Sequence, residues 1–316
     1  MPVPRAGGVP EYGPGGTINF NPEIYSGKLV EKFYKTTVFG EICTTDYEGD
    51  IAGFGANVII RTVPDVAVSD YVIGAGLSAQ YPSRNSVTLS IDQAKSFNVA
   101  LNTVDSRQSD LDLSDIFAND GSIQLKIAAD VDMLATIPAQ VAAANQGATA
   151  GADSQNINLG TVSAPVTLVA SGATGLQQNV IDWIVGCGTV LDEQNVSDEG
   201  RWMVLPPWVI ALIKRSDLRI ASLAGDGVSI LRNGKVGMID RFTIYQSRNV
   251  LKGLTPQLAW ATMFGHSAGL AFAAQIVEAQ MIDNPNDFGY LIRGLMVFGY
   301  KVIESNYVGT SFVRPA

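Results

Sequence analysis

Alternating apolar and polar positions predict strand structure between residues 87 and 102. Apolar side chains recur at every second position over residues 87–91 and again over residues 97–101. A period of two places these side chains on one face of an extended chain, as in a strand that is buried on one side only. We therefore expect strands here, with the other face in contact with solvent.

A longer apolar period then predicts one amphipathic helix within residues 111–144, most regular over residues 113–137. Asp112 is the predicted N-cap, and Asp115 follows in the first turn, where free N–H groups and the helix dipole favour negative charge. Its end is signalled by Pro138 and then Gly147. At the usual rise per residue such a helix would be roughly 35 to 40 Å long, so it could serve as a spine for the fold.

The apolar stripe of this helix predicts its buried face. The stripe consists of Ile116, Ile123, Ile127, Leu134 and Val141, with Val131 beside it. The predicted solvent-exposed flank carries Asp115, Ser122 and Lys126. Asn119 and Asp130 fall near the apolar stripe, and these are the two positions where the pattern fits an amphipathic helix poorly.

A long excursion precedes this region. Residues 56–63 predict a strand, and residues 64–85, of mixed turn and polar character, connect it to the strand that begins at Val87. Structureless connections above about 15 residues are uncommon inside a compact domain. We therefore predict an extended two-stranded arm whose outer part, residues 64–85, binds an adjacent subunit. The candidate contact residues are Arg61, Asp65, Asp70, Tyr71, Tyr81 and Arg84.

The start of the chain predicts a second arm. Residues 1–21 are rich in Pro and Gly, with Arg5 and Glu11 as their only charged side chains, which suits an extended segment that orders on a partner. Residues 22–36 predict a short amphipathic helix, and Gly40 is expected to end this region.

The second half predicts an α+β protein without a regular βαβ repeat. We expect strands at 166–170, 201–205 and 242–246, and a helix at 177–194 that is interrupted by Gly186 and Gly188. A further helix should begin at Pro207, which suits a first helical turn. Residues 284–286 predict a turn, and residues 147–172 give no confident strand assignment apart from 166–170.

Composition narrows the class of protein. The 316 residues are 47% hydrophobic and 16% charged, which is typical of a globular protein. The 21 Lys and Arg residues are outnumbered by 30 Asp and Glu residues, for a net charge of −9 without long runs of either sign, which disfavours nucleic-acid binding. No signal-peptide layout or long apolar span occurs, so we expect a soluble protein made inside the cell. Cys43 and Cys187 are far apart and predict two buried thiols.

The search for catalytic motifs gives one match, Gly265-His266-Ser267-Ala268-Gly269, which fits the G-x-S-x-G nucleophile elbow. His266 is the only histidine, and a residue adjacent to the serine cannot readily reach its hydroxyl, so the triad lacks a base. We interpret this stretch as a Gly-rich turn. Gly234-Lys235 does not form a Walker loop, and the cluster at residues 283–287 does not fit a calcium loop. We expect no catalytic residue, cofactor or metal.

Several stretches resemble the major capsid proteins of tailed bacteriophages. They are SVTLS with IDQAKSFNVALNTVD, LDLSDIFANDGSIQLKIAADVD, and above all VLDEQNVSDEGRWMVLPPWVIALIKRSD with GKVGMIDRFTIYQSRNV. The resemblance extends from residue 22 almost to the C-terminus, and it implies the Hong Kong 97 fold. The implied parts are an N-terminal arm (1–43), an extended two-stranded E-loop (44–92), a peripheral domain (93–174) with a spine helix (111–144), an axial domain (175–275) and return strands of the peripheral domain (276–316).

The resemblance implies a structural subunit that self-assembles, as hexamers and pentamers, into the icosahedral head shell of a tailed phage. Its implied partners are a portal protein and the packaged double-stranded DNA, enclosed without sequence-specific binding; a decoration protein is left open. It implies a location in the virion, assembly in the host bacterial cytoplasm, and no membrane. Because residues 1–21 do not suit a charged helical scaffold, we expect a separate scaffolding protein and no proteolytic maturation. The alternatives are a nanocompartment shell of the same fold, a phage tail or adhesin protein, and, less favoured, a serine hydrolase.

The faces assigned to the long helix can be tested with two neighbouring substitutions. Ile127→Asp should lower the free energy of unfolding by several kcal/mol, because it places an unpaired charge where we expect a branched apolar side chain to be buried. Lys126→Asp, on the exposed flank, should cost under about 1 kcal/mol. Thermal melts of the two variants give the ranking, and the reverse order would show that the helix faces are misassigned.

Overall fold

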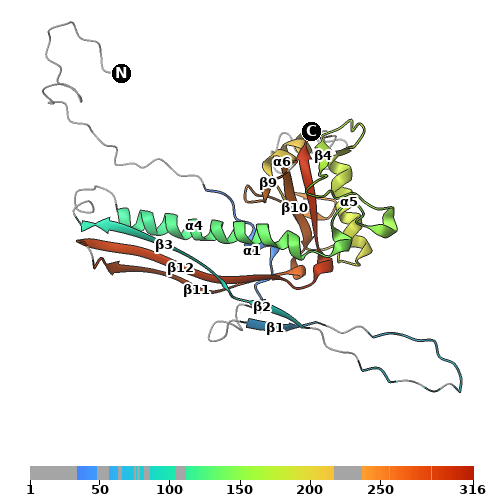
Figure 1. Ribbon diagram of the computed structural model, residues 1–316, viewed down its shortest axis with the longest axis horizontal. Coiled ribbons are helices and arrows are strands. Elements are labelled where there is room, and N and C mark those ends of the chain that lie inside the picture. Colours follow the sequence, from blue (N-terminus) through green and yellow to red (C-terminus); the bar gives the residue numbers. More distant parts are fainter. Residues whose placement is uncertain are drawn as a thin grey trace, which may run out of the picture.

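The computed structural model describes residues 34–47, 57–62, 66–74, 76, 79–81, 86–103, 112–216, 237–255, 257–285 and 287–316. This part of the chain is α+β, as predicted, and contains sheets of eight, three and two strands. Figure 1 shows an elongated arrangement in which a long helix lies along the three-stranded sheet. The eight-stranded sheet lies at one end of that helix, and the two-stranded sheet lies on the other side of the three-stranded sheet.

The three-stranded sheet joins one early strand to two late ones. Its order is β11 (Leu270–Asp283), β12 (Gly289–Val302) and β3 (Gln93–Asn102), with both pairs antiparallel. Helix α4 (Leu113–Thr136) packs across β12 and β3. The period-two pattern predicted β3, but it could not identify a partner strand almost 200 residues away.

The long helix begins where the sequence predicted and ends earlier. The Asp112 side chain accepts a hydrogen bond from the Asp115 backbone N–H, which satisfies one of the free donors of the first turn. The helix stops at Thr136 and does not continue to residue 144, because Pro138 lies in the 3₁₀ helix Ile137–Gln140 that follows. A second 3₁₀ turn, Ala143–Asn145, lies within the range that was expected to be helical.

The predicted faces of α4 are largely confirmed. Ile127 and Leu134 are buried, whereas Ser122 and Lys126 are exposed. The position of Val131 was wrong, because 37% of this residue is exposed. Asp130 is fully buried instead, which explains why a carboxylate lies near the apolar stripe of the sequence.

Asp130 fastens the N-terminal segment to the helix. Its Oδ1 accepts hydrogen bonds from the backbone N–H groups of Val38 (2.9 Å) and Phe39 (3.0 Å), and its Oδ2 accepts one from Asn249 Nδ2 (2.7 Å). The carboxylate thereby caps the short helix α1 (Phe39–Ile42), which has no side-chain cap of its own. Burial raises the pKa of Asp130, and the three hydrogen bonds act in the opposite direction. Helix α1 contains Gly40, where the sequence predicted an end; most of the expected helix at 22–36 lies outside the described residues, and residues 34–36 are not helical.

The Phe97 side chain packs between α4 and the three-stranded sheet. Its ring lies between two glycines: a Cβ at Gly121 of α4 would lie 2.5 Å from Phe97 Cζ, and a Cβ at Gly294 of β12 would meet the same ring from the sheet. Gly121 therefore occupies the middle of a helix, where glycine is unfavourable, because only a missing side chain lets the ring fit.

The eight-stranded sheet collects strands from the whole second half of the chain. Its order is β5 (Gln177–Asn179), β4 (Val166–Val169), β13 (Val308–Pro315), β10 (Ala259–His266), β6 (Arg201–Leu205), β8 (Phe242–Gln246) and β7 (Met238–Ile239), and β9 (Lys252–Leu254) pairs with β10. The predicted strands at 201–205 and 242–246 are confirmed, and the predicted strand at 166–170 corresponds to β4.

After Arg201, strand β6 is apolar at every position because both of its faces are covered. Met203 and Leu205 belong to a core shared with α5 (Val180–Glu193) and α6 (Pro207–Arg215). Trp202 and Val204 belong to a second core, which includes the buried residues of α4. Pro207 is the first residue of α6, as predicted, whereas α5 runs through its glycines without the expected interruption.

Two connections between strands link the eight-stranded sheet to the three-stranded sheet, and they lie next to each other. Strand β10 passes into β11 through the 3₁₀ turn Ser267–Gly269, and β12 passes into β13 through Ser305–Tyr307. Because β10 pairs with β13 and β11 pairs with β12, the four strands form a single antiparallel ribbon that runs through both sheets. Asn145 Nδ2 holds the second crossing by donating to the carbonyls of Asn306 (2.7 Å) and Val308 (3.1 Å).

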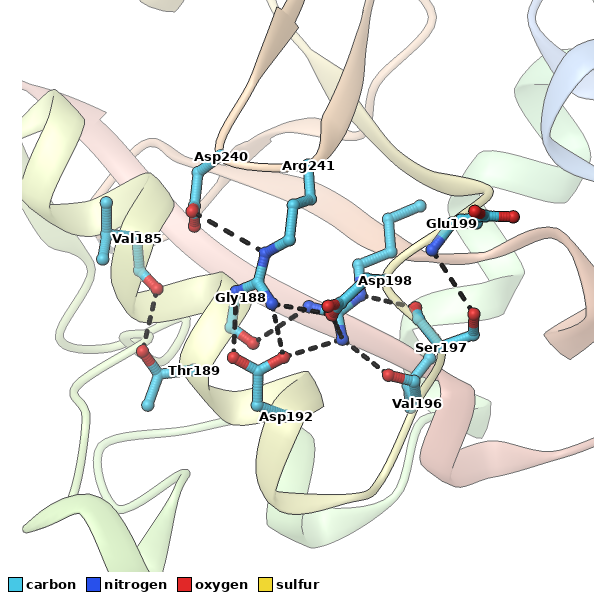
Figure 2. Close-up of polar contacts among 11 residues, drawn as sticks. Val185, Gly188, Thr189, Asp192, Val196, Ser197, Asp198, Glu199, Asp240 and Arg241 are labelled. Atoms are coloured by element: carbon cyan, nitrogen blue, oxygen red, sulfur yellow. Dashed lines mark hydrogen bonds and ion pairs between the residues drawn. The ribbon is translucent and has the colours of Figure 1, made fainter.

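A charged network fixes the turn between α5 and β6. The Arg201 guanidinium is buried and forms ion pairs with Asp192 (2.7 Å) and Asp198 (3.1 Å). Figure 2 shows the same two carboxylates converging on Arg241, with contacts of 2.9 and 2.7 Å. Arg201 also donates to the carbonyls of the turn, including that of Val196 (2.6 Å). The buried guanidinium thus has both counter-charges and acceptors, as a buried charge requires.

The packing of Phe97 against Gly121 predicts that Gly121→Ala lowers the stability of the protein, whereas this substitution in a helix usually raises it. Replacing a helical glycine by alanine normally stabilises a protein by about 0.4 to 1 kcal/mol. Here the new methyl group would overlap a ring that Gly294 confines from the other side, so we expect destabilisation by about 1 to 3 kcal/mol. Denaturant unfolding measures the difference, and Ser122→Ala, one residue along on the exposed flank, should stay within about 0.5 kcal/mol. A stabilised Gly121→Ala variant would contradict this packing of Phe97 against the helix.

The charged network predicts a pH-dependent effect of Asp192→Asn. Burial acts to raise the pKa of Asp192, but hydrogen bonds and positive charge from Arg241 and Arg201 lower it below the ordinary value. A lowered folded-state pKa means that this carboxylate stabilises the fold above the unfolded-state value of about 4, and that the contribution is lost as pH falls through the folded-state pKa.

At pH 7 we therefore expect Asp192→Asn to cost about 1 kcal/mol, a magnitude kept low because the side chain is 40% exposed. The difference in melting temperature from the wild type should shrink as the pH is lowered below about 4. Glu199→Gln, an exposed substitution on the same turn, serves as control and should have little effect at any pH. A deficit that stays constant between pH 7 and pH 3 would contradict the electrostatic origin.

Candidate assembly surface

The base of the excursion is anchored in a small core of its own. Strands β1 (Asn57–Arg61) and β2 (Ser86–Ser90) pair antiparallel, with Asn57 opposite Ser90 and Arg61 opposite Ser86. Ile60 and Leu89 are buried, and with Ile91 they pack against two alanines of β11, Ala271 and Ala273. The alternate residues Leu270 and Phe272 belong to the core under α4. The start of β11 is therefore apolar at every position, because it has a core on each face.

A side-chain amide joins the two limbs farther out. The Ala67 backbone N–H donates to Gln80 Oε1 (3.1 Å), and Gln80 Nε2 donates back to the Ala67 carbonyl (2.6 Å). This pair of bonds resembles one rung of an antiparallel ladder, formed where the described residues have no regular strand. Figure 1 shows these described segments extending away from α4 and the sheets.

The excursion carries a concentration of exposed apolar side chains. Val68 is 96% exposed and Tyr81 is 93% exposed. The full set on β1 and the outer segments is Ile59, Val66, Val68, Tyr71, Val72, Ile73 and Tyr81. Burying one such side chain fully is worth about 1.5 to 3 kcal/mol. Apolar groups gathered on a thin extension cannot be buried by that extension alone, so they indicate a surface that a partner covers.

The structure places four of the six predicted contact residues on this surface. Arg61 is exposed at the outer end of β1, and Asp70, Tyr71 and Tyr81 are exposed in the segments beyond it. Asp65 and Arg84 lie outside the described residues. The four are spread along the excursion and do not form one compact cluster.

Sequence reasoning chose charged and phenolic residues and missed the aliphatic ones. Val68, Val72 and Ile73 are among the most exposed apolar residues of the described chain. Their signal was present in the sequence as short apolar pairs and triplets within a turn-rich stretch. Such groups are expected in a core, and only their position in space shows that no core formed by the described residues includes them.

The Gly-rich stretch at 265–269 is a structural turn, as predicted. His266 Nδ1 accepts a hydrogen bond from the Ala268 backbone N–H (3.1 Å), and its ring packs edge-on against Tyr307. His266 Nδ1 therefore caps this turn. The stretch links β10 to β11 at the crossing between the sheets.

The two cysteines lie in the interior, as predicted. Cys43 and Cys187 are buried free thiols, and burial raises the pKa of each. Within the described ranges, no group of three or more His, Cys, Asp or Glu side chains could hold a metal ion. None of the helices in those ranges has the length and apolar character needed to cross a bilayer.

Solved structures of phage particles share this fold. A chain from Mycobacterium phage Che8 matches with a TM-score of 0.72 and 25% identity, covering 92% of this chain and 97% of its own length. The capsid structure of cyanophage P-SCSP1u matches with a TM-score of 0.70 and 14% identity, covering 98% of each chain. The mature capsid of bacteriophage PhiM1 matches with a TM-score of 0.67 and 13% identity, covering 95% of this chain and 93% of that one.

These matches extend over nearly the full length of both partners in each comparison, so the whole architecture is shared. No protein-family model matches the sequence, and no curated protein matches it significantly. The chain is thus an α+β protein with the fold of phage capsid proteins. The resemblance to such proteins that the sequence indicated is confirmed.

Proposed function

We propose that this protein is the major capsid protein of a tailed bacteriophage, a structural subunit that self-assembles into an icosahedral shell around double-stranded DNA. The observation that carries the proposal is the excursion, whose exposed apolar side chains have no core of their own. The shared fold of phage capsid chains supports the same function. Shells are built from many copies held by large interfaces, and an arm that packs on a neighbour supplies interface area without a larger core.

The Hong Kong 97 parts can then be assigned as proposals. The excursion with β1 and β2 is the E-loop, and α4 is the spine helix of the peripheral domain together with β3, β11 and β12. The eight-stranded sheet with α5 and α6 is the axial domain. Strand pairing supports including β4 and β13 in this domain, although they lie outside the axial range 175–275 inferred from the sequence. The N-terminal arm includes the segment that Asp130 holds.

The proposed partners are other copies of this chain in hexamers and pentamers, a separate scaffolding protein, a portal protein and the enclosed DNA. The net charge of −9 supports a container, because a strongly basic wall would hold nucleic acid too tightly for packing and release. The alternative is a nanocompartment shell of the same fold, which would enclose protein. The reported structural matches come from phage particles, which favours the phage shell. Nuclease-protected DNA in purified particles supports the proposal, and protein cargo would support the alternative.

The excursion can be tested by changing two of its most exposed apolar residues. Val68→Asp combined with Ile73→Asp should leave the subunit folded, because neither side chain is buried in it, and should abolish shell assembly, because each would place a charge in an apolar interface. Circular dichroism and thermal melts report folding, and sedimentation with electron microscopy reports assembly.

The matched control changes the same two positions conservatively, as Val68→Ile with Ile73→Val, and should still assemble. Deleting residues 64–85 should also give a soluble, folded protein that does not form shells. Normal closed particles from the double aspartate variant would disprove this role for the excursion. Loss of the folded state in that variant would show that these side chains are needed within the subunit and would equally contradict the proposal.

A further inference from the structure

A pocket on the eight-stranded sheet combines aromatic and cationic side chains in an otherwise acidic protein. Its volume is about 530 Å³, and it is lined by Pro207, Trp208, Gln246, Arg248, Lys252 and Trp260. These residues come from the start of α6, the end of β8 and the segment after it, and the paired strands β9 and β10. None of the lining residues is acidic, although the chain as a whole carries a net charge of −9.

The two tryptophans form the apolar wall of the pocket. The Trp208 and Trp260 rings lie edge to face, with their centroids 6.4 Å apart. Both rings are only partly buried, whereas the other two tryptophans, Trp183 and Trp202, are almost completely buried in the cores. Trp208 Nε1 also has no hydrogen-bond partner among the described residues. Partly covered indoles of this kind are typical of the central residues of binding sites.

Positive charge converges on the same pocket from three sources. Arg248 and Lys252 are exposed cations, and Lys252 Nζ lies 5.8 Å from the centroid of the Trp260 ring. Helix α6 begins at Pro207, and its N-terminus has no side-chain cap. The dipole of that helix end adds partial positive charge. The pocket therefore suits an anion that is attached to an apolar group.

From this combination we propose that the pocket binds an acidic peptide segment of a partner protein, one that places a bulky apolar or aromatic side chain beside carboxylates. The apolar side chain would lie against the indoles, and the carboxylates would pair with Arg248 and Lys252. Charge complementarity to an acidic partner is the basis of this choice.

Nucleic acid fits the same geometry less well. Stacking of a base requires a free aromatic face, and Lys252 lies over one face of Trp260 while the two indoles are edge to face rather than parallel. Duplex DNA would not use the indoles, because its bases are already stacked. The pocket also lies apart from the excursion, since Figure 1 shows α6 and β9 far from β1 and β2.

Tryptophan fluorescence of the full-length protein provides the test, because Trp208 and Trp260 are the two tryptophans near the surface. The probe is a synthetic peptide of four Glu-Phe-Glu repeats. The comparison peptides replace Phe by Ser or Glu by Lys, and a twelve-nucleotide oligothymidylate represents nucleic acid. We expect saturable binding of the Glu-Phe-Glu peptide, at least about tenfold tighter than that of either comparison peptide or of the oligonucleotide.

Charge reversal then locates the site. Arg248→Glu with Lys252→Glu should lower the affinity for the Glu-Phe-Glu peptide by about tenfold or more, and Lys252→Gln should lower it less. Arg215→Glu makes a matched change at the other end of α6 and should leave the affinity unchanged. Thermal melts should show that all these variants fold, because the changed side chains are exposed.

Three results would overturn the proposal: no saturable binding of the peptide, an equal loss of affinity in Arg215→Glu, or tighter binding of the oligonucleotide than of the peptide. The last result would identify the pocket as a nucleic-acid site. Binding is measured on subunits and does not require a shell. Failure of this inference is therefore distinguishable from failure of the proposed capsid function.

Discussion

The antiparallel ribbon made by β10 with β13 and by β11 with β12 is the feature on which the rest of the structure depends. It crosses from the eight-stranded sheet into the three-stranded sheet through two short 3₁₀ turns, Ser267–Gly269 and Ser305–Tyr307, which contact each other. Beside them the Ile303 N–H donates to the Gly269 carbonyl (2.9 Å). The two sheets are therefore joined by two short crossings that lie together. Helix α4 lies on one face of the ribbon, and the base of the excursion lies on the other.

This construction suits a building block. The ribbon runs through both sheets and so fixes the two ends of the elongated body relative to each other. The excursion and the segment that Asp130 holds are attached to this body. Asp130 shows how such a segment is attached: a buried carboxylate satisfies two backbone donors that a short helix leaves open. The polar group specifies where the segment lies, and the surrounding apolar contacts supply most of the binding.

The two candidate surfaces differ in chemistry. The excursion presents mainly aliphatic and tyrosine side chains, which suit a permanent contact between copies of one chain. The pocket near Trp208 and Trp260 presents cations beside indoles, which suits a charged segment that binds and leaves. A shell protein that carries both could hold its neighbours firmly and a second partner more weakly.

The sequence by itself determined the elements whose signal is local. The period of β3, the Asp112 cap of α4, and Pro207 at the start of α6 all follow from dihedral preferences and hydrogen bonding within a few residues. Tertiary structure decided the rest, because burial depends on chain segments far away in sequence. It buried Asp130 beside Val38, exposed Val131, placed Gly121 against Phe97, and left the aliphatic residues of the excursion in solvent. No local pattern carries that information, because an apolar side chain gives the same sequence pattern whether it packs in the core of its own subunit or against a neighbouring subunit.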